Sequence, residues 1–264
     1  MLVVSGTPWF WDQCQVSKKY EVLKYMISVF KDRPKIALGL GSCYPMVFSY
    51  SEDYNYIKEI WGQFNFISVR DSIAANLLAN NEVQVYSTFC TSSFYPYYPK
   101  KEQIVLTPTV VFYEPSIGVS KSILSSEYIT KYRLFQIEVI KRYSAQVLVL
   151  DEREGKFLES FNIQSHKVLN HYDLMEKLNG SSFVLSGRVH SAIPARMMGI
   201  PTYILPVDTR WLTTLNFGIT PIFDLNNSLK VPSKNLFNND IRQNCEKEAE
   251  KLSDIIKLKL NSVF

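Results

Sequence analysis

The chain has 264 residues, of which 46% are hydrophobic and 20% charged; these fractions exclude wholesale disorder and fit one large folded domain or two small ones. The formal net charge of +4 is mild, and because basic residues are scattered among acidic ones the sequence indicates no nucleic-acid-binding stripe. No segment reaches the roughly 18 consecutive apolar residues that a membrane-spanning helix needs.

The chain start and the cysteines indicate a cytoplasmic protein. The first residues, MLVVSGTPWFWDQC, lack the basic region and the long apolar run of a secretory signal. The four cysteines are far apart and form no CxxC pair, so we expect reduced packing residues rather than zinc ligands or disulfides. The sequence implies no metal and no cofactor, and a peripheral association with the membrane stays open.

In the first part of the chain, short apolar runs alternate with amphipathic stretches. The pattern predicts strands at 1–5, 35–42, 64–69 and 82–86, and helices at 17–31, 52–62 and 71–81. Asp71 is expected to cap the last of these helices. This alternation is typical of a parallel sheet covered by helices.

Turn-forming residues interrupt the pattern at 87–103, which we interpret as a linker or domain boundary. A second alternating set follows, with strands at 104–113, 146–150, 166–170, 183–186 and 202–206, and helices ending near Arg142, starting near Glu152, and at 173–180 and 191–199. The tail from 239 to 260 fits an amphipathic helix packed on the body.

This organisation predicts an α/β fold with two Rossmann-like lobes and a cleft between them. The N-terminal lobe spans residues 1–98, and the C-terminal lobe spans residues 99–264 and includes the terminal helix. In open parallel sheets, ligands bind outside the carboxyl ends of the strands. We therefore expect the functional residues in the loops that follow the strands.

The segment SGRVHSAIPARMMGIP, residues 186–201, contains the main candidates. Gly187, Arg188, His190 and Ser191 lie between a predicted strand and a predicted helix. A helix N-terminus attracts anions, and an arginine fork suits a carboxylate or phosphate. A histidine can transfer protons near neutral pH. The alternative is that the arginine caps a neighbouring helix and the histidine is a satisfied core residue.

Two further pairs lie at predicted strand ends. Asp208 can cap a helix whose first turn contains Arg210; because an arginine there opposes the helix dipole, we expect a ligand or a carboxylate partner. Arg70 precedes the cap residue Asp71 and is expected either to face the cleft or to be paired structurally. A surface salt bridge is the alternative for Arg210.

Glycine turns follow two early strands. Gly6 and Thr7 follow the first, and Gly41 and Ser42 end the second. Neither turn matches GxGxxG or a P-loop, so neither alone indicates a nucleotide.

Taken in order, VSGTPWFWD, ALGLGSCYP, ISVRDSIAANLL, FVLSGRVHSAIPARMMGIP and VDTRWLTTLNFGI resemble the polysaccharide pyruvyl transferase family. The likeness covers most of the chain, and the R-x-H segment is its most specific part. Two departures are visible: the chain begins at what would be an internal strand of the family, and Thr91 stands where the family has proline.

The resemblance implies a fold like a GT-B glycosyltransferase, with a shortened N-terminal lobe. It implies transfer of a pyruvyl group from phosphoenolpyruvate to a sugar of a cell-surface polysaccharide or its precursor, forming a ketal. The family's R-x-H pair maps onto Arg188 and His190 as catalytic residues, and its R-D pair onto Arg70 and Asp71.

The substrates themselves suggest further roles. Phosphoenolpyruvate carries a carboxylate and a phosphate, so Arg188 with the helix start at Ser191, together with Arg70 or Arg210, would anchor it. His190 is the candidate general acid and base. The acceptor is expected to be a sugar or a lipid-linked oligosaccharide; the oligomeric state stays undefined.

Two alternatives stay open. The first is a GT-B-type glycosyltransferase that uses a nucleotide sugar, with Arg188 holding the diphosphate; a shared fold does not separate it from a pyruvyltransferase. The second is a catalytically inactive glycan-binding scaffold, which the two departures from the family pattern favour.

Overall fold

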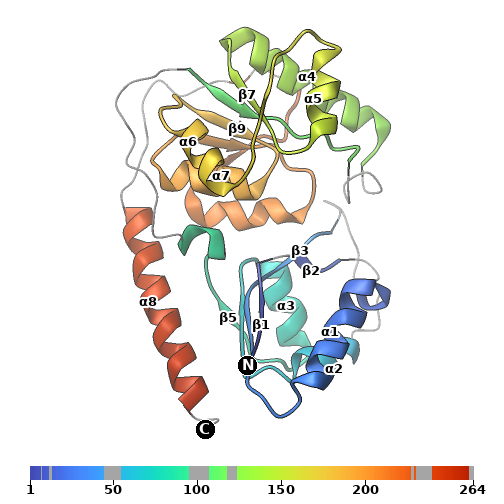
Figure 1. Ribbon diagram of the computed structural model, residues 1–264, viewed down its shortest axis with the longest axis vertical. Helices are drawn as coiled ribbons and strands as arrows, with labels where there is room; N and C mark the ends of the chain where they lie inside the picture. The colour runs from blue at the N-terminus through green and yellow to red at the C-terminus, as the bar shows by residue number, and fades with distance from the viewer. Residues whose placement is uncertain are drawn as a thin grey trace. The chain divides into compact units, whose positions relative to one another are not determined.

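The computed structural model describes residues 1–6, 8–11, 14–44, 55–94, 107–117, 124–226, 229 and 240–261. The chain divides into two compact units: unit 1 comprises Met1–Phe94 and Arg242–Phe264, and unit 2 comprises Tyr95–Ile241. Each unit has a β-sheet of its own in which every strand pair is parallel (Figure 1). The predicted class, α/β with two parallel Rossmann-like sheets, is confirmed.

Unit 1 holds the sheet with strand order β1-β3-β4-β5, in which β2 also pairs with β3. Its strands are β1 (Leu2–Ser5), β2 (Pro8–Phe10), β3 (Lys35–Ser42), β4 (Phe66–Val69) and β5 (Tyr86–Ser87). Its helices are α1 (Lys18–Val29), α2 (Asn55–Trp61), α3 (Ser72–Asn80) and most of α8 (Asp240–Asn261), with 3₁₀ helices η1 (Cys14–Val16) and η2 (Thr91–Phe94).

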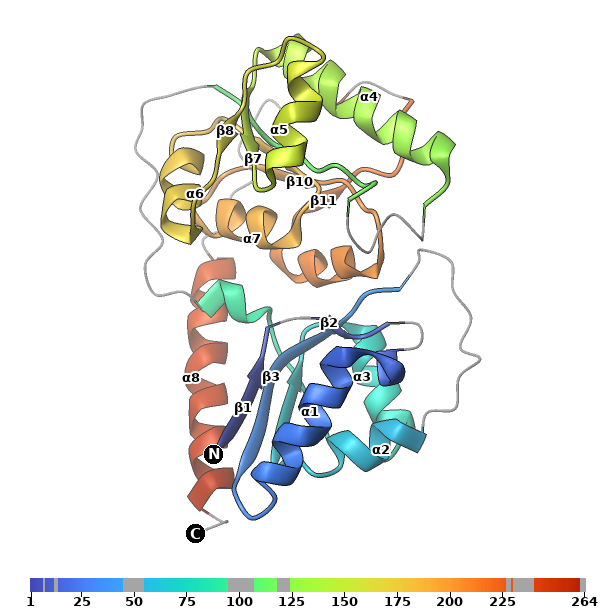
Figure 2. The same ribbon diagram turned by 45° about the vertical axis from the view of Figure 1, so that its right-hand side comes forward.

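The sheet of unit 1 is covered on both faces. Helices α1, α2 and α3 lie on one side of β1 and β3, and α8 lies on the other (Figure 2). Strand β3 is buried along almost its whole length, which is why its sequence is a continuous apolar run rather than an alternating one. Leu252 of α8 packs against Ile36 and Phe66 of the sheet.

The terminal helix corrects the predicted domain organisation. Its range, Asp240–Asn261, is close to the predicted 239–260, but from Arg242 onward it belongs to unit 1 rather than to the C-terminal lobe. The reason is the contact of Leu252, Ile255 and Ile256 with the sheet of unit 1. The apolar stripe of the helix showed that one face is buried but not which sheet buries it.

Unit 2 holds a six-stranded sheet with strand order β11-β10-β9-β6-β7-β8. Its strands are β6 (Thr109–Val111), β7 (Gln146–Val149), β8 (His166–Lys167), β9 (Val184–Ser186), β10 (Thr202–Ile204) and β11 (Thr220–Pro221). Its helices are α4 (Ser126–Tyr143), α5 (Glu152–Glu159), α6 (His171–Leu178), α7 (Val189–Met197) and the 3₁₀ helix η4 (Thr209–Phe217).

Side-chain caps define most helix starts. Ser17, Asp71, Ser125, Asp151 and Asn170 each accept a hydrogen bond from the first turn of α1, α3, α4, α5 and α6, respectively. The expected cap at Asp71 is therefore confirmed. These polar residues precede apolar periodic segments, so the helix starts are readable in the sequence.

Several predicted strands are shorter in the structure. Strand β5 has only two residues, and β8 has two exposed residues where 166–170 was predicted. Both are edge strands, so one hydrogen-bonding side has no partner strand and the apolar pattern alone overstates their length. Part of the predicted 52–62 helix and of the predicted 104–113 strand falls outside the described residues, as does most of the 87–103 linker.

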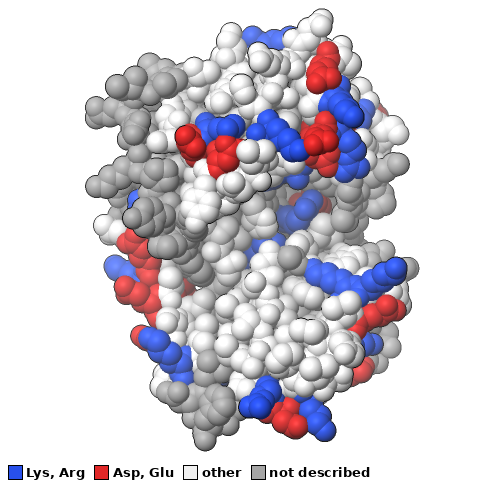
Figure 3. All heavy atoms as spheres, viewed as in Figure 1, with Lys and Arg blue, Asp and Glu red and all other residues white. Residues whose placement is uncertain are grey.

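Several other properties bear on the expectations from composition. The four cysteines are buried and none forms a disulfide. Among the described residues, no helix combines the length and the apolar character needed to cross a membrane. On the face seen in Figure 3, lysine and arginine are interspersed with aspartate and glutamate.

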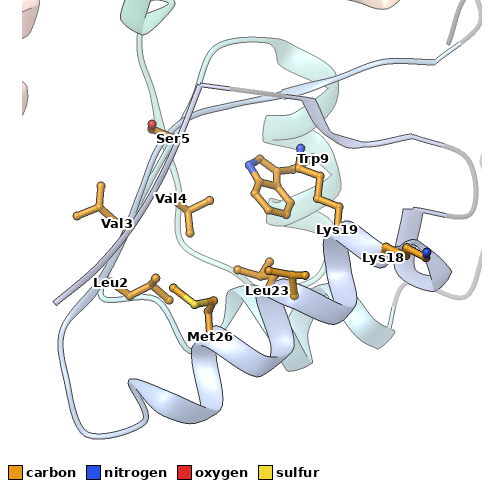
Figure 4. Close-up of a pocket in the computed structure, with 10 residues that line it drawn as sticks. Leu2, Val3, Val4, Ser5, Trp9, Lys18, Lys19, Leu23 and Met26 are labelled. Carbon is orange, nitrogen blue, oxygen red and sulfur yellow. The ribbon is translucent and has the colours of Figure 1, made fainter. Parts of the chain in front are cut away.

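A groove of about 500 Å³ lies between β1 and α1 in unit 1 (Figure 4). Its lining is mostly apolar and includes Val4, Trp9, Leu23 and Met26, with Lys18 and Lys19 at one end. None of the predicted site residues lines this groove, so it is separate from the candidate site.

Candidate functional site

The order of strands in unit 2 reverses between β6 and β9. From this point β7 and β8 follow on one side, and β9, β10 and β11 occupy the other. Such a reversal parts the loops at the carboxyl ends of the two strands, which is where open α/β sheets bind ligands. The loop after β9 contains Gly187 and Arg188, the strongest candidates from the sequence.

Arg188 is held on this loop by one edge and one face of its guanidinium group. Its Nη2 donates to Oε1 of Glu154 at 2.6 Å, and its Cζ lies 4.7 Å from the centre of the Tyr113 ring. Its Nε is buried and has no hydrogen-bond partner among the described atoms. A buried, unsatisfied donor on a cation is costly, so this nitrogen has a hydrogen bond to offer an anionic acceptor.

Glu154 joins the ends of neighbouring strands to Arg188. The residue is 0% exposed, and its carboxylate accepts from the backbone N–H groups of Glu114, Leu150 and Asp151, each at 3.1 Å. Three backbone donors and one guanidinium satisfy the buried charge, which makes the ion pair tolerable. Glu154 was not among the residues predicted from the sequence, although its place in a capping box with Asp151 is a readable signal.

A second ion pair lies beside the first. Glu114, which follows β6, is 3% exposed and accepts from Nε and Nη2 of Arg133 at 2.8 and 2.7 Å. Burial alone would raise the pKa of the Glu114 carboxyl, but hydrogen bonds from Arg133 and Ser116 outweigh it and lower the pKa. Glu114 therefore stays ionised and keeps Arg133 in place at the end of β6.

Gly187 is required at its position for space. A Cβ atom there would lie 2.1 Å from Oη of Tyr132 and 2.6 Å from Cβ of Tyr113. Ser186 closes the turn, because its Oγ accepts from the backbone N–H of Arg188 at 2.9 Å and donates to the Arg188 carbonyl at 3.0 Å. The loop is thus packed tightly against the tyrosines, and this fixes the start of α7.

Unlike the helices whose first turn is capped by a side chain, α7 begins without such a cap. Arg188 occupies the N-cap position and makes no side-chain cap hydrogen bond. Ser191, in the first turn, is 1% exposed, and its Oγ has no hydrogen-bond partner within the described residues. The first turn of a helix carries partial positive charge, so these groups together offer an anion site.

His190 lies in the same first turn and is exposed. Burial lowers the pKa of His171, and the charge of His190 lowers it further. The two histidines are therefore close enough for their charges to interact. Because α7 begins at Val189, earlier than the predicted 191, Pro194 falls in the second turn of the helix. Proline has no N–H, so residue 194 cannot donate the helical hydrogen bond to the carbonyl of His190.

Arg210 has the carboxylate partner that its position predicts. Asp208 is 1% exposed and caps η4 by accepting from the Arg210 backbone N–H at 3.0 Å. Its two oxygens also accept from Nε at 2.7 and 2.9 Å and from Nη2 at 2.5 Å. The pair is therefore a partly buried salt bridge at the end of β10, and substrate binding by either residue stays a prediction.

In unit 1, Asp71 ties the end of β3 to α3. Its carboxylate accepts from the Ala74 backbone N–H at 2.9 Å, from the Ser42 N–H at 2.8 Å and from Ser42 Oγ at 3.0 Å. Ser42 thus has a structural role at this strand end, and a substrate contact for it stays a prediction.

Arg70 is 3% exposed and lies across the carboxyl ends of the strands of unit 1. Its Nη1 lies 3.5 Å from the carbonyl oxygen of Gly6 and 3.7 Å from Sγ of Cys90. A Cβ atom at Gly41 would lie 2.4 Å from its Nε, so glycine makes room for the arginine. The structural pairing considered for Arg70 is therefore present.

The structure thus brings Gly6, Gly41, Ser42, Arg70 and Asp71 together in unit 1, while Thr7 lies outside the described residues. Thr91, noted as a departure from the family pattern, packs over Gly39 within β3, where a Cβ atom would lie 2.8 Å from its Cγ2. In unit 2, Gly187, Arg188, His190 and Ser191 share one loop and helix start.

Comparison with known proteins gives one family. The family model described as polysaccharide pyruvyl transferase matches residues 11–209. A search of curated proteins finds no match.

Among solved structures, a UDP-GlcNAc 2-epimerase of Methanocaldococcus jannaschii in complex with UDP-GlcNAc and UDP is 14% identical, with a TM-score of 0.47 over 89% of this chain and 79% of that one. An S. aureus MnaA–UDP structure is 16% identical, with a TM-score of 0.49 over 99% and 69% of the two chains. A Neisseria meningitidis UDP-GlcNAc 2-epimerase bound to UDP-GlcNAc is 11% identical, with a TM-score of 0.40 over 94% and 77%.

Proposed function

The chain belongs to the polysaccharide pyruvyl transferase family, and from this premise we propose that it transfers the pyruvyl group of phosphoenolpyruvate to two hydroxyls of a sugar, forming a ketal. The observation that carries the proposal is the pair of buried, unpartnered polar atoms at the start of α7, Arg188 Nε and Ser191 Oγ. Both lie at the strand reversal where α/β sheets bind ligands.

In this proposal the donor binds at the start of α7. Phosphoenolpyruvate presents two anionic groups, and the unpartnered Nε of Arg188 with the N–H groups of the first helical turn would receive one of them. Ser191 Oγ would donate a further hydrogen bond. Glu154 and Tyr113 hold the guanidinium in place before the ligand arrives, which reduces the entropy lost on binding.

The reaction needs a proton donor beside the donor's methylene carbon. His190 would protonate this carbon, converting it to a methyl group, while a sugar hydroxyl attacks the central carbon and loses its proton. Cleavage of the bond between that carbon and the phosphate oxygen releases phosphate, and a second hydroxyl of the same sugar attacks the same carbon to close the ketal. The proton of the first hydroxyl returns to His190, and that of the second leaves with the phosphate. His190 is exposed in the first turn of α7, so it can exchange protons with water between turnovers.

The reaction itself is the direct test. Phosphate release from phosphoenolpyruvate and the new ketal methyl signal in proton NMR are followed with polysaccharide precursors as acceptors. We expect Arg188→Ala and His190→Ala to abolish both signals. The matched controls Arg142→Ala and His166→Ala alter exposed residues, one at the end of α4 just before β7 begins and one on the edge strand β8, and should retain both signals.

The outcomes separate the assignments. If the wild type transfers pyruvate and both site variants do so equally well, the site at Arg188 and His190 is wrong. If the wild type releases no phosphate but binds UDP-GlcNAc through Arg188, the pyruvyl-transfer proposal itself fails, because the same helix start would also take a diphosphate.

A further inference from the structure

Two aromatic side chains form a partly exposed pair on unit 2. The rings of Trp211 and Phe223 have their centres 5.0 Å apart and meet edge to face at 85°. Phe223 is 51% exposed, and Trp211 is half-buried on η4. A single exposed aromatic ring is ordinary at a protein surface, but two such rings in contact present an apolar face to a ligand.

The other tryptophans have an evident structural use. Trp9 and Trp61 are buried in the core of unit 1, and Trp11 packs against the same core. Trp211 instead contacts an exposed phenylalanine at the end of a sheet. The aromatic richness of the sequence is therefore explained by core packing in unit 1 but not at Trp211.

The aromatic pair lies at the same edge of the sheet as Arg188. Trp211 follows the carboxyl end of β10, and Phe223 follows that of β11. Strand β9, which ends before Arg188, is the next strand after β10. Since neighbouring strands are about 4.8 Å apart, the end of β11 lies roughly 10 Å from the end of β9. This separation is about the length of one or two sugar rings.

Charged groups accompany the rings. Arg210 precedes Trp211, has a side chain 32% exposed, and is held by the buried Asp208. Asp224 follows Phe223 and is exposed. A pyranose ring needs this combination, because one face presents C–H groups to an aromatic ring while its hydroxyls need hydrogen-bonding groups at the side.

We propose that Trp211 and Phe223 form a platform on which a pyranose ring of the acceptor glycan stacks, with Arg210 and Asp224 bonding its hydroxyls. The inference rests on the proposed function only in taking the acceptor to be a sugar. It places the acceptor at the loops that follow β10 and β11, and it leaves the donor at the start of α7.

Fluorine NMR of protein labelled with fluorotryptophan tests the platform without any reaction. The protein has four tryptophans, and the Trp211 signal is the one that Trp211→Phe removes. Methyl β-D-galactopyranoside, which presents one apolar C–H face, is the probe. We expect a saturable shift of the Trp211 signal, with the other three signals unmoved.

Variants of the second ring sharpen the test. Phe223→Ala should weaken binding of the probe about tenfold, because the C–H face of the sugar loses its apolar contact with one ring. Phe223→Tyr keeps a ring and should bind like the wild type. Tyr172→Ala removes an aromatic side chain that is 68% exposed on α6 and should change nothing.

The proposal is overturned if the Trp211 signal does not move at saturating probe, or if Phe223→Ala binds the probe as tightly as the wild type. Binding of phosphoenolpyruvate is measured on the same samples. Sugar binding without phosphoenolpyruvate binding leaves the platform standing and contradicts the donor assignment, and the reverse result contradicts the platform alone.

Discussion

Arg188 owes its position to Glu154, which is distant in sequence. The Glu154 carboxylate accepts hydrogen bonds from three backbone N–H groups and from the guanidinium, so both of its oxygens are satisfied. Glu154→Gln keeps the size of the side chain, but its amide nitrogen cannot accept the N–H groups of Leu150 and Asp151. We expect a loss of about 2–3 kcal/mol in the free energy of unfolding and weaker binding of phosphoenolpyruvate.

Urea denaturation and ligand-induced shifts in melting temperature measure both effects. Glu152→Gln is the control, because Glu152 is exposed and pairs with Lys167 at the surface. Such a pair contributes no more than about 1 kcal/mol. Equal effects of the two substitutions would contradict the role given to Glu154.

We predict opposite effects on stability when each of two glycines is replaced by alanine. Gly187→Ala would place a methyl group 2.1 Å from Tyr132 Oη and should cost about 1–3 kcal/mol in stability. Gly155 lies inside α5, where an added methyl group would meet only ordinary contacts, the nearest at 3.5 Å from Ser165 Oγ. Gly155→Ala should therefore gain about 0.5–1 kcal/mol.

Chemical denaturation of both variants measures these changes in the free energy of unfolding. Adding Tyr132→Phe to Gly187→Ala removes the hydroxyl in the closest contact and should recover part of the lost stability. If Gly187→Ala is as stable as the wild type and Tyr132→Phe adds no stability to it, the loop is not packed against the tyrosines.

The sequence predicted those residues whose role depends only on the helix or strand that they adjoin. Asp71 and Asp208 are caps because each precedes its own helix, and Arg188 lies at a strand end because the apolar run before it ends there. Glu154, Tyr113 and Tyr132 reach Arg188 and Gly187 from distant parts of the chain. Such contacts depend on the strand order, which a single sequence does not reveal.

The elements differ in how far their surroundings could be predicted. The terminal helix was predicted almost to its ends, yet its docking surface was not. Leu252 is 7% exposed against the sheet of unit 1, and burial raises the pKa of the neighbouring Cys245 thiol to about 11. We expect Leu252→Ala to loosen α8, with a loss of about 3 kcal/mol, and to speed alkylation of Cys245.

Mass spectrometry of alkylated peptides identifies the thiol that reacts. Leu258→Ala, on the same helix but 70% exposed, is the control and should leave the rate unchanged. If Leu252→Ala leaves Cys245 as slow to react as in the wild type, α8 does not depend on this contact.

Helix α1 contains a lysine whose titration should be visible in stability. Lys19 Nζ donates to the Pro8 carbonyl at 2.6 Å and lies 3.9 Å from the centre of the Trp9 ring. Burial, followed by the charge of Arg70, lowers its pKa from 10.5 to about 8. Between these pH values the unfolded chain holds a proton that the folded protein has released, so the free energy of unfolding rises with pH.

The stability of the wild type relative to Lys19→Gln should therefore be constant below about pH 8 and increase from there toward pH 10.5. Urea midpoints of the two proteins, measured side by side across this range, give the difference. A difference that stays flat or decreases as the pH rises would show that the pKa of Lys19 is not depressed.

On the scale of the whole chain, the alternation of strands and helices was enough to predict two parallel sheets. The assignment of α8 to the second lobe was wrong, because the helix returns to the first sheet after the chain has completed the second. The sequence pattern gives each element in turn. It carries no information on which sheet a late element joins, since both sheets offer an apolar face.

The central claim is that phosphoenolpyruvate binds at the start of α7 through Arg188. The most direct measurement is the melting temperature of the wild type, Arg188→Ala and the control Arg142→Ala with phosphoenolpyruvate, phosphate and UDP-GlcNAc. A ligand at about 100 times its dissociation constant adds roughly 2.7 kcal/mol to the stability of the folded state. We predict a rise with phosphoenolpyruvate that Arg142→Ala retains and Arg188→Ala loses. A rise that survives in Arg188→Ala, or that only UDP-GlcNAc produces, would contradict the claim.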